Sequence, residues 1–248
     1  MGHFKIDGTR CVDVYFNKKD IVELTNRWKC YVENIKPYPN VFKGKGIVIC
    51  AGGISYFTCS SILINILRNE LKCSLPIEVW YYGNELTEET KRYYEKLNVT
   101  CHDIFNYVKT SFFHGWMLKS LAIKYSNFKE ILYLDADNVC TTDPEFLFNI
   151  YEYKKYGSIF WPDYWHTDPN NQIWEIMRVR PNNMKEQESG QILINKERCW
   201  RELNLATYLN ENFHIYYNFL LGDKDTFKFS WMALCMSSNK IRHFCLNP

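Results

Sequence analysis

The 248-residue sequence lacks an apolar run long enough for a membrane-spanning helix, which needs about 20 consecutive apolar residues. Residues 1–20 also lack the apolar core of a secretory signal. We therefore expect a soluble chain with no membrane span, in a compartment that these residues alone do not fix.

An excess of one charge is also lacking, because 30 Lys and Arg residues nearly balance 28 Asp and Glu residues. The formal net charge is +2. Proteins that bind nucleic acids or anionic membranes usually gather basic residues on one face. Nucleic acid is therefore not an expected partner.

Several short motifs are missing as well. The ten cysteines are scattered without a C-x-x-C pair, so we expect mostly buried thiols rather than zinc ligands or a disulfide framework. None of the six histidines pairs at metal-ligand spacing, and neither G-x-G-x-x-G nor the P-loop pattern occurs. Because no linker, repeat or low-complexity tract is present, a single domain is the economical interpretation.

The sequence does have enough apolar residues for a full-sized core, with 46% hydrophobic and 23% charged residues. Aromatic residues reach 17%. They can pack an ordinary core, or they can provide flat faces on which sugar rings or bases stack. Composition does not separate these two roles.

Short apolar runs alternate with segments of helical periodicity, which is typical of an α/β protein with a mostly parallel sheet flanked by helices. We predict strands at 46–51, 77–81, 99–102, 131–134, 158–161 and 191–195, and helices at 58–71, 87–97, 116–125, from 143, at 197–212 and at 222–236. Residues 1–43 are expected to form a helical lead-in to a domain at 44–248. Residues 162–183 are expected to form a long loop over the site.

The strongest chemical signal is the triplet Asp135-Ala136-Asp137, directly after the predicted strand at 131–134. Ligands of parallel α/β sheets gather at the carboxyl ends of strands. Two carboxylates there repel each other unless a cation or protons intervene, and hard oxygen ligands suit Mg²⁺ or Mn²⁺ on a diphosphate. A solvated turn is the alternative that the triplet alone leaves open.

Weaker signals occur elsewhere along the chain. Glycines after the first strand let the backbone approach a nucleotide, although a plain turn explains them as well. Acids that open the last helix are favoured by its dipole with or without a function. These segments are Gly52-Gly53, Gly222-Asp223-Lys224-Asp225 and Glu188-Ser189-Gly190-Gln191, with His114 and Lys119 near the helix before the Asp-x-Asp strand.

Seven ordered blocks between about residues 46 and 234 resemble the fungal Golgi α-1,3-mannosyltransferase family. They are GIVICAGG, LPIEVWYYG, GWMLKSLAI, ILYLDADNV, GSIFWPDYW, ESGQILINK and GDKDTF. The resemblance implies a GT-A fold and transfer of mannose from GDP-mannose, with retention of configuration, to a glycan or glycoprotein acceptor. It also implies a Mn²⁺ or Mg²⁺ cofactor and residence in the Golgi lumen, whereas a complete chain without an anchor would be cytoplasmic.

The resemblance also implies roles for individual residues. The metal and diphosphate pair would be Asp135 and Asp137, around Ala136. Catalytic groups beside the donor sugar would be Asp223, Lys224, Asp225 and Glu188. Other donor contacts would come from Ala51, Gly52, Gly53, Lys119, Asp163, Ser189, Gly190 and Gln191. If the family takes a third metal ligand from its C-terminal tail, His243 or water would have to fill that position.

Three alternatives stay open at this point. The same chemistry can use a UDP-sugar such as UDP-glucose, because no residue identifies the base or the sugar. A haloacid-dehalogenase-like phosphatase also carries a D-x-D-x-[TV] motif, which Asp135 to Val139 fits, although that motif normally ends the first strand of its sheet. A carbohydrate-binding protein without activity would keep the aromatic cleft and need no metal.

Overall fold

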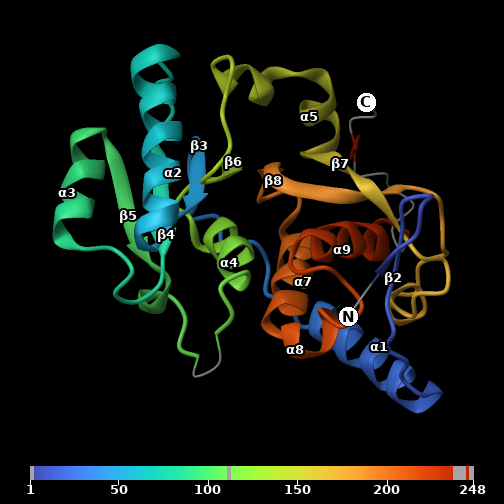
Figure 1. The fold of residues 1–248 in the computed structure, drawn as a ribbon. Coiled ribbons are helices and arrows are strands. Elements are labelled where there is room, and N and C mark those ends of the chain that lie inside the picture. Colours follow the sequence, from blue (N-terminus) through green and yellow to red (C-terminus); the bar gives the residue numbers. More distant parts are fainter. Residues whose placement is uncertain (1–2, 111–112, 237–243, 246–248) are drawn as a thin grey trace.

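A mixed β-sheet runs through the computed structural model, which describes residues 3–110, 113–236 and 244–245 (Figure 1). Its strands are β1 (His3–Phe4), β2 (Thr9–Cys11), β3 (Lys45–Cys50), β4 (Ile77–Tyr81), β5 (Val99–Asp103), β6 (Glu130–Asp135), β7 (Ser158–Thr167), β8 (Lys185–Asn195) and β9 (Phe244–Cys245). They lie in the order β1-β2-β7-β8-β6-β3-β4-β5, with β9 beside β7. Strands β6, β3, β4 and β5 are parallel, whereas β8 is antiparallel to β6 and β7. The predicted mostly parallel α/β sheet is confirmed.

Helices cover both faces of this sheet. They are α1 (Lys18–Glu33), α2 (Gly53–Asn65), α3 (Glu88–Lys96), α4 (Met117–Tyr125), α5 (Tyr151–Tyr156), α6 (Ile173–Ile176), α7 (Trp200–Glu211), α8 (Phe213–Tyr216) and α9 (Lys224–Met236). Because side chains alternate along a strand, Ile47 and Ile49 of β3 share a core with α2 and α3, while Val48 shares one with α4, α7 and α9. The sheet is therefore the middle of three layers.

The predicted strands all occur, but β7 continues to Thr167 instead of ending at 161, and β8 begins at Lys185 instead of 191. The helix predicted from residue 58 begins earlier, at Gly53, and continues into a π-helical turn at Ile66–Glu70. The helix predicted after Asp143 is instead a 3₁₀ turn at Pro144–Asn149 followed by α5, because Ile150 between them has extended dihedral angles.

The first 43 residues contain the predicted helix and also two strands that were not predicted. Helix α1 starts at Asn17, whose side chain accepts the Asp20 N–H, and it buries Leu24 and Trp28 against α6, α7 and α9. The β1–β2 hairpin extends the sheet, because β2 pairs in parallel with β7. Strands of two or three residues carry too little periodicity to be recognised in the sequence.

The prediction of a long loop over the site at 162–183 is wrong. Strand β7 continues to Thr167, and α6 follows with Ile173, Trp174 and Ile176 buried in the core beneath α1. The Trp174 indole N–H donates to the Asp168 carbonyl at 2.9 Å. Trp165 packs against Phe4, with ring centroids 4.1 Å apart. This segment therefore fixes the N-terminal hairpin and α1 to the domain rather than closing over a ligand.

The eight cysteines from Cys11 to Cys199 are free thiols, as expected, but fewer of them are buried than expected. Cys11, Cys73 and Cys199 are buried, Cys30 is exposed, and the other four are half-buried.

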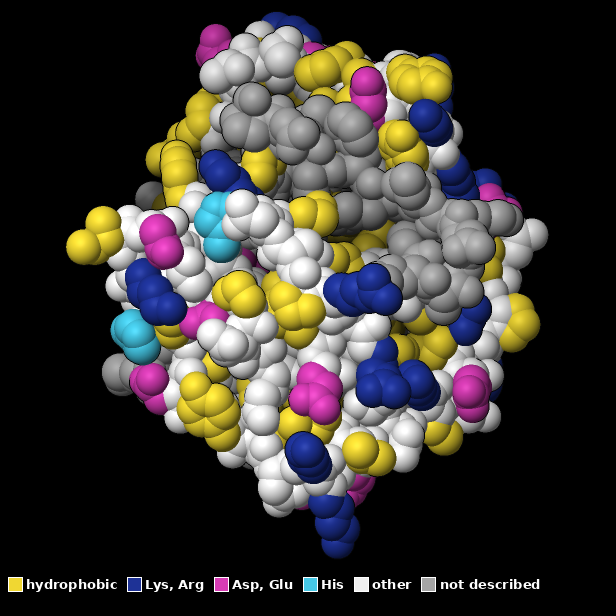
Figure 2. Space-filling view, turned by 90° about the vertical axis from the view of Figure 1, so that its right-hand side faces the viewer, with side chains coloured by type: hydrophobic (Ala, Val, Ile, Leu, Met, Phe, Trp, Pro, Cys, Tyr) yellow, Lys and Arg dark blue, Asp and Glu magenta, His cyan; other side chains and the backbone are white. Residues whose placement is uncertain are grey.

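The side of the molecule that carries β2 and β7 has a mixed surface. Among the described residues in Figure 2, positive and negative side chains are interspersed and hydrophobic side chains form small separate groups. The described residues of this face therefore do not form the continuous basic surface that nucleic acids require. Within the described ranges, no helix combines the length and the apolar character needed to cross a bilayer.

Candidate active site

A cavity of about 750 Å³ opens where β3, β4 and β6 end. Helices α2, α4 and α9 all begin at its wall, so three helix N-termini lie around the same space. The N-terminal end of a helix dipole carries partial positive charge, which favours an anion such as a diphosphate. The cavity therefore lies where an α/β sheet normally binds its ligand.

Most of the residues predicted for the site line this cavity. They are Ala51, Gly52, Lys119, Asp135, Ala136, Asp137, Glu188, Ser189, Asp223 and Lys224. Five others are not among the residues that line it, namely Gly53, Asp163, Gly190, Gln191 and Asp225. The sequence signals from five separate segments thus converge on one place.

Lys119 holds a cluster of acids on one side of the cavity. Its ammonium lies 3.2 Å from Asp135 Oδ1 and 3.1 Å from Asp223 Oδ2. It also donates to the Ser189 carbonyl at 3.0 Å and the Ser189 hydroxyl at 2.9 Å. These four groups, which we call the Lys119 cluster, join α4, β6, β8 and the start of α9.

Burial and charge oppose each other at Lys119. Burial alone would lower the pKa of its ammonium, but attraction from Asp223 and Asp135 outweighs burial and raises it above the ordinary lysine value. Tyr133 lies beneath, and its hydroxyl donates to Asp135 Oδ1 at 2.6 Å. Burial, followed by the nearby Cys50 and Asp135, holds the pKa of Tyr133 well above its usual value. Lys119 therefore stays charged and Tyr133 stays a hydrogen-bond donor.

The paired acids fit a divalent ion only with help from other ligands. Asp137 is exposed and the Asp135 side chain is 36% exposed, so each of the two carboxylates can reach a ligand in the cavity. Within residues 3–110, 113–236 and 244–245, no group of three His, Cys, Asp or Glu side chains is placed to hold a metal. Mg²⁺ typically uses one or two carboxylates and takes its remaining ligands from phosphates and water. His243, the other candidate ligand, lies outside the described residues.

The two glycines after β3 differ in what they do. A Cβ on Gly52 would lie within 1.9 Å of the Glu85 carboxylate, so glycine is required there for Glu85 to pack over the end of β3. Gly53 has a φ of +68° and turns the chain into α2, while its N–H donates to the Glu85 carbonyl at 3.1 Å. Gly52 lines the cavity and Gly53 does not, and a contact of either glycine with a nucleotide stays a prediction.

Gly190 brings Glu188 close to the Asp-x-Asp segment. Its N–H donates to Glu188 Oε1, and its carbonyl accepts from the Asn138 amide. A Cβ on Gly190 would lie 2.7 Å from Glu188 Oε1 and 3.3 Å from Asp135 Oδ2. A larger residue at this position would push the Glu188 carboxylate away and crowd the carboxylate of Asp135 on the neighbouring strand.

Lys224 holds a second and deeper set of acids. Its ammonium contacts Asp163 Oδ2 at 2.5 Å, Glu186 Oε2 at 2.6 Å and Asp225 Oδ2 at 3.6 Å. Arg10 Nε donates to Glu186 Oε1 at 2.7 Å. We call these five residues the Lys224 cluster.

The electrostatics of the Lys224 cluster follow from its burial. Burial opposes ionisation of Glu186, but Arg10 and Lys224 outweigh it and hold the pKa of Glu186 below its usual value. Burial and the neighbouring Glu186 raise the pKa of Asp225. Burial would lower the pKa of Lys224, yet the charges of Asp225 and Glu186 raise it. Asp225, predicted as a catalytic group, thus lies among buried charges beneath the cavity.

Sequence reasoning missed Tyr133, Arg10 and Glu186. Tyr133 lies in the apolar strand ILYL and looks like an ordinary core residue. Arg10 and Glu186 are 176 positions apart, and no local pattern links them. Glu85 carried a usable signal, because it follows the second predicted strand at the same sheet edge as the Asp-x-Asp triplet.

The solved structures that are similar to this chain include glycosyltransferases of the GT-A type. WbbM, a bifunctional glycosyltransferase, is similar with a TM-score of 0.58 at 10% identity, over 86% of this chain and 40% of WbbM. An active-site mutant of the galactosyltransferase LgtC has a TM-score of 0.52 at 13% identity, over 75% of this chain and 69% of LgtC. The fold is therefore that of a GT-A glycosyltransferase.

The chain belongs to the family described as "Mannosyltransferase putative", whose model matches residues 44–187 and 180–241. This membership places the chain in a family of glycosyltransferases and not in the phosphatase family of the alternative. It also broadens the resemblance found in the sequence, because most of the similar curated proteins are named α-1,2- rather than α-1,3-mannosyltransferases.

Two of these relatives are α-1,2-mannosyltransferases. MNN24 of Candida albicans is 29% identical over 84% of this chain and 36% of its own length. MNN2 of Saccharomyces cerevisiae is 26% identical over 88% of this chain and 45% of its own length. MNN14 of Candida albicans, named a putative α-1,3-mannosyltransferase, is 30% identical over 50% of this chain and 20% of its own length. The chain thus spans less than half of the length of each.

Proposed function

We propose that this chain transfers mannose from GDP-mannose to a hydroxyl group of a mannose-containing glycan or glycoprotein, with retention of configuration and with Mn²⁺ or Mg²⁺. One observation carries the proposal: Lys119, Asp135, Asp137 and Asp223 converge on one cavity at the strand ends. In a chain of the mannosyltransferase family, this arrangement supports binding and activation of a sugar diphosphate.

Loss of the nucleoside diphosphate from the sugar builds negative charge on phosphate oxygens, and that charge is what the site must stabilise. A divalent ion held by Asp135 and Asp137 would supply a Lewis acid for those oxygens. The N-termini of α2 and α4, at Gly52 and Trp116, lie at the cavity wall, and the positive ends of their dipoles would favour the same anion. Lys119 holds Asp135 and Asp223 in place, and its direct contact with phosphate stays a prediction.

Retention requires the acceptor hydroxyl to attack on the face from which the diphosphate leaves. Two routes satisfy this requirement: a short-lived ion pair guided by the departing phosphate, or an intermediate on a carboxylate. Asp223 and Glu188 line the cavity and are the candidate carboxylates. Asp225 is fully buried, so it supports the site through Lys224 rather than by reaching the sugar.

We propose an α-1,2 linkage for the product. The α-1,2-mannosyltransferases MNN24 and MNN2 match 84% and 88% of this chain, whereas the α-1,3 relative MNN14 matches 50%. The α-1,3 linkage expected from the sequence blocks is therefore the second candidate.

The test is a donor panel. Purified protein is incubated with Mn²⁺, an α-mannoside acceptor and each of several GDP- and UDP-sugars, while nucleotide release and the NMR spectrum of the product are measured. The expected result is GDP release from GDP-mannose, an anomeric signal of an α-1,2 linkage, and no release by Asp137→Asn. Equal turnover in metal-free buffer, or phosphate release from a simple phosphomonoester alone, would contradict the proposal. Release only from a UDP-sugar would keep the chemistry and change the donor.

A further inference from the structure

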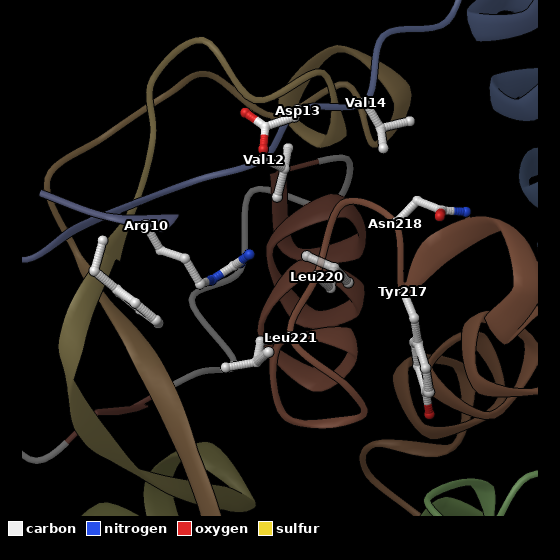
Figure 3. Close-up of a pocket in the computed structure, with 9 residues that line it drawn as sticks. Arg10, Val12, Asp13, Val14, Tyr217, Asn218, Leu220 and Leu221 are labelled. Carbon is white, nitrogen blue, oxygen red and sulfur yellow. The ribbon is translucent and has the colours of Figure 1, made fainter. Parts of the chain in front are cut away.

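Arg10 reaches the proposed site from the N-terminal hairpin, outside the matched span of residues 44–241. It is 2% exposed, although it belongs to a strand of three residues near the chain's start. Figure 3 shows its side chain pointing from β2 toward the loop with Leu220 and Leu221, beside a small cavity of about 160 Å³. A buried guanidinium needs partners, and those partners identify what Arg10 does.

The first partner leads to Lys224. Arg10 Nε donates to Glu186 Oε1 at 2.7 Å, and the other oxygen of the same carboxylate accepts from Lys224 Nζ at 2.6 Å. Glu186 is fully buried between them. The position of Lys224, which lines the large cavity, therefore depends on a carboxylate that Arg10 fixes from behind.

The second partner of Arg10 is the backbone carbonyl of Phe219, five residues before Lys224. Arg10 Nη1 donates to the Phe219 carbonyl at 3.3 Å, which also accepts from the Asn171 amide at 2.8 Å. The segment from Phe219 to Lys224, which we call the 219–224 loop, supplies Leu221, Gly222, Asp223 and Lys224 to the cavity wall. One guanidinium thus contacts the start of the loop directly and its end through Glu186.

We propose that Arg10 is a positioning residue that holds the 219–224 loop, and with it Asp223 and Lys224, in the geometry that sugar transfer requires. This inference rests on the proposed function for its catalytic consequence. The planar guanidinium suits the role because it directs several N–H donors at fixed angles to separate acceptors. A lysine ammonium concentrates its charge at one point and cannot span Glu186 and Phe219 together.

The test compares Arg10→Met, Arg10→Lys and Lys5→Met with the wild-type protein. Lys5→Met is a matched control, because Lys5 lies in the same hairpin, its side chain is 51% exposed, and it pairs with Asp168 at 3.5 Å rather than with Glu186 or Phe219. Backbone hydrogen exchange of the loop peptide is followed by mass spectrometry below the unfolding temperature of every variant. Calorimetry gives the affinity for GDP, and the donor assay gives kcat and KM.

Arg10→Met is expected to speed exchange in the 219–224 loop by about tenfold, because charge-assisted hydrogen bonds to the loop and to Glu186 are lost. Its kcat should fall by about tenfold to hundredfold while GDP affinity stays near that of the wild type, since misplaced groups affect the transition state most. Arg10→Lys should fold and show an intermediate effect on both readouts. Lys5→Met should match the wild type.

Unchanged exchange in the loop of both Arg10 variants would overturn the proposal, whether or not the protein transfers sugar. Faster exchange with wild-type kcat would also overturn it, because Arg10 would then be a structural residue only. If the wild-type protein transfers no sugar from any donor, the proposed function fails, and loop exchange still decides whether Arg10 holds the loop. If Arg10→Met does not fold, loop exchange and kcat of Arg10→Lys are compared with those of the wild type instead.

Discussion

Two lysines reach the same cavity from different helices, and each is surrounded by acids, yet their surroundings differ. In the Lys119 cluster the Asp135 side chain is 36% exposed, and both acids line the cavity. In the Lys224 cluster Glu186 and Asp225 are fully buried and Arg10 closes the far side. The first cluster has oxygens that can turn to a ligand, whereas the second has its oxygens occupied by protein cations.

This difference shows that a lysine surrounded by acids can belong either to a ligand-binding site or to a buried structural cluster. The exposure of the acids decides whether the cluster can exchange a partner for a ligand. A buried ion pair adds little net stability but becomes costly when one partner is removed. We therefore expect substitutions in the Lys119 cluster to affect activity first, and substitutions in the Lys224 cluster to affect stability first.

The largest effect is expected for Asp135→Asn. The amide keeps the size of the side chain but loses the charge that would hold a metal, so transfer should fall by about a thousandfold. Because Asp135 is partly exposed, the thermal midpoint should shift by no more than about 3 °C. Nucleotide release and thermal unfolding measure the two quantities. Asp143→Asn, at a helix cap outside the cavity, is the control, and a variant with the rate of the wild type would refute the role of Asp135.

Glu186→Gln should affect stability more strongly than Asp135→Asn does. Removing the carboxylate between Arg10 and Lys224 leaves two buried cations poorly compensated, which should cost about 3 kcal/mol in unfolding free energy. Urea denaturation measures the loss. The control is Glu145→Gln, because the pair of Glu145 with Lys45 is partly exposed and should contribute less than about 1 kcal/mol. Equal losses for both variants would remove the distinction between the two clusters.

The sequence predicted the outline of the site well because its signals are local. Asp135 and Asp137 follow an apolar strand, and strand ends gather at one sheet edge, so their placement follows from topology. The Lys224 cluster could not be predicted in full, because Arg10 sits in a three-residue strand and meets Glu186 only through the fold. The error at 162–183 has another cause. There the Pro and Asn content outweighed Ile173, Trp174 and Ile176, whose apolar side chains mark a buried turn of helix.

The pH dependence of stability should distinguish two acids within the Lys224 cluster. The pKa of Glu186 is lowered by Arg10 and Lys224 against the effect of burial, so its contribution is present above its ordinary pKa and is lost as pH falls through the lowered value. The pKa of Asp225 is raised, first by burial, so its ionisation destabilises the fold as pH rises through the raised value.

Asp225→Asn should therefore gain stability relative to the wild type as pH rises above the ordinary carboxyl range near about 4. The Gln187 N–H, which donates to Asp225 Oδ1 at 3.1 Å, keeps an acceptor in the amide. For Glu186→Gln, the loss of unfolding free energy relative to the wild type should instead be largest at neutral pH. Urea denaturation across a pH series measures both, and parallel curves for the two variants would show that the two acids do not differ.

The smallest effect is expected for Asp163→Asn, at the boundary between the two environments. The Asp163 side chain is 15% exposed and contacts Lys224 at 2.5 Å, but Lys224 keeps Glu186 and Asp225 when that charge is removed. The loss of stability should stay near about 1 kcal/mol, as for pairs that water screens. Because Asp163 is not among the residues that line the cavity, kcat should stay within about threefold of the wild type, a change of about 0.7 kcal/mol or less. A hundredfold loss of kcat with unchanged unfolding would instead place Asp163 against the substrate, as the sequence predicted, and the Lys224 cluster would then belong to the reacting part of the site.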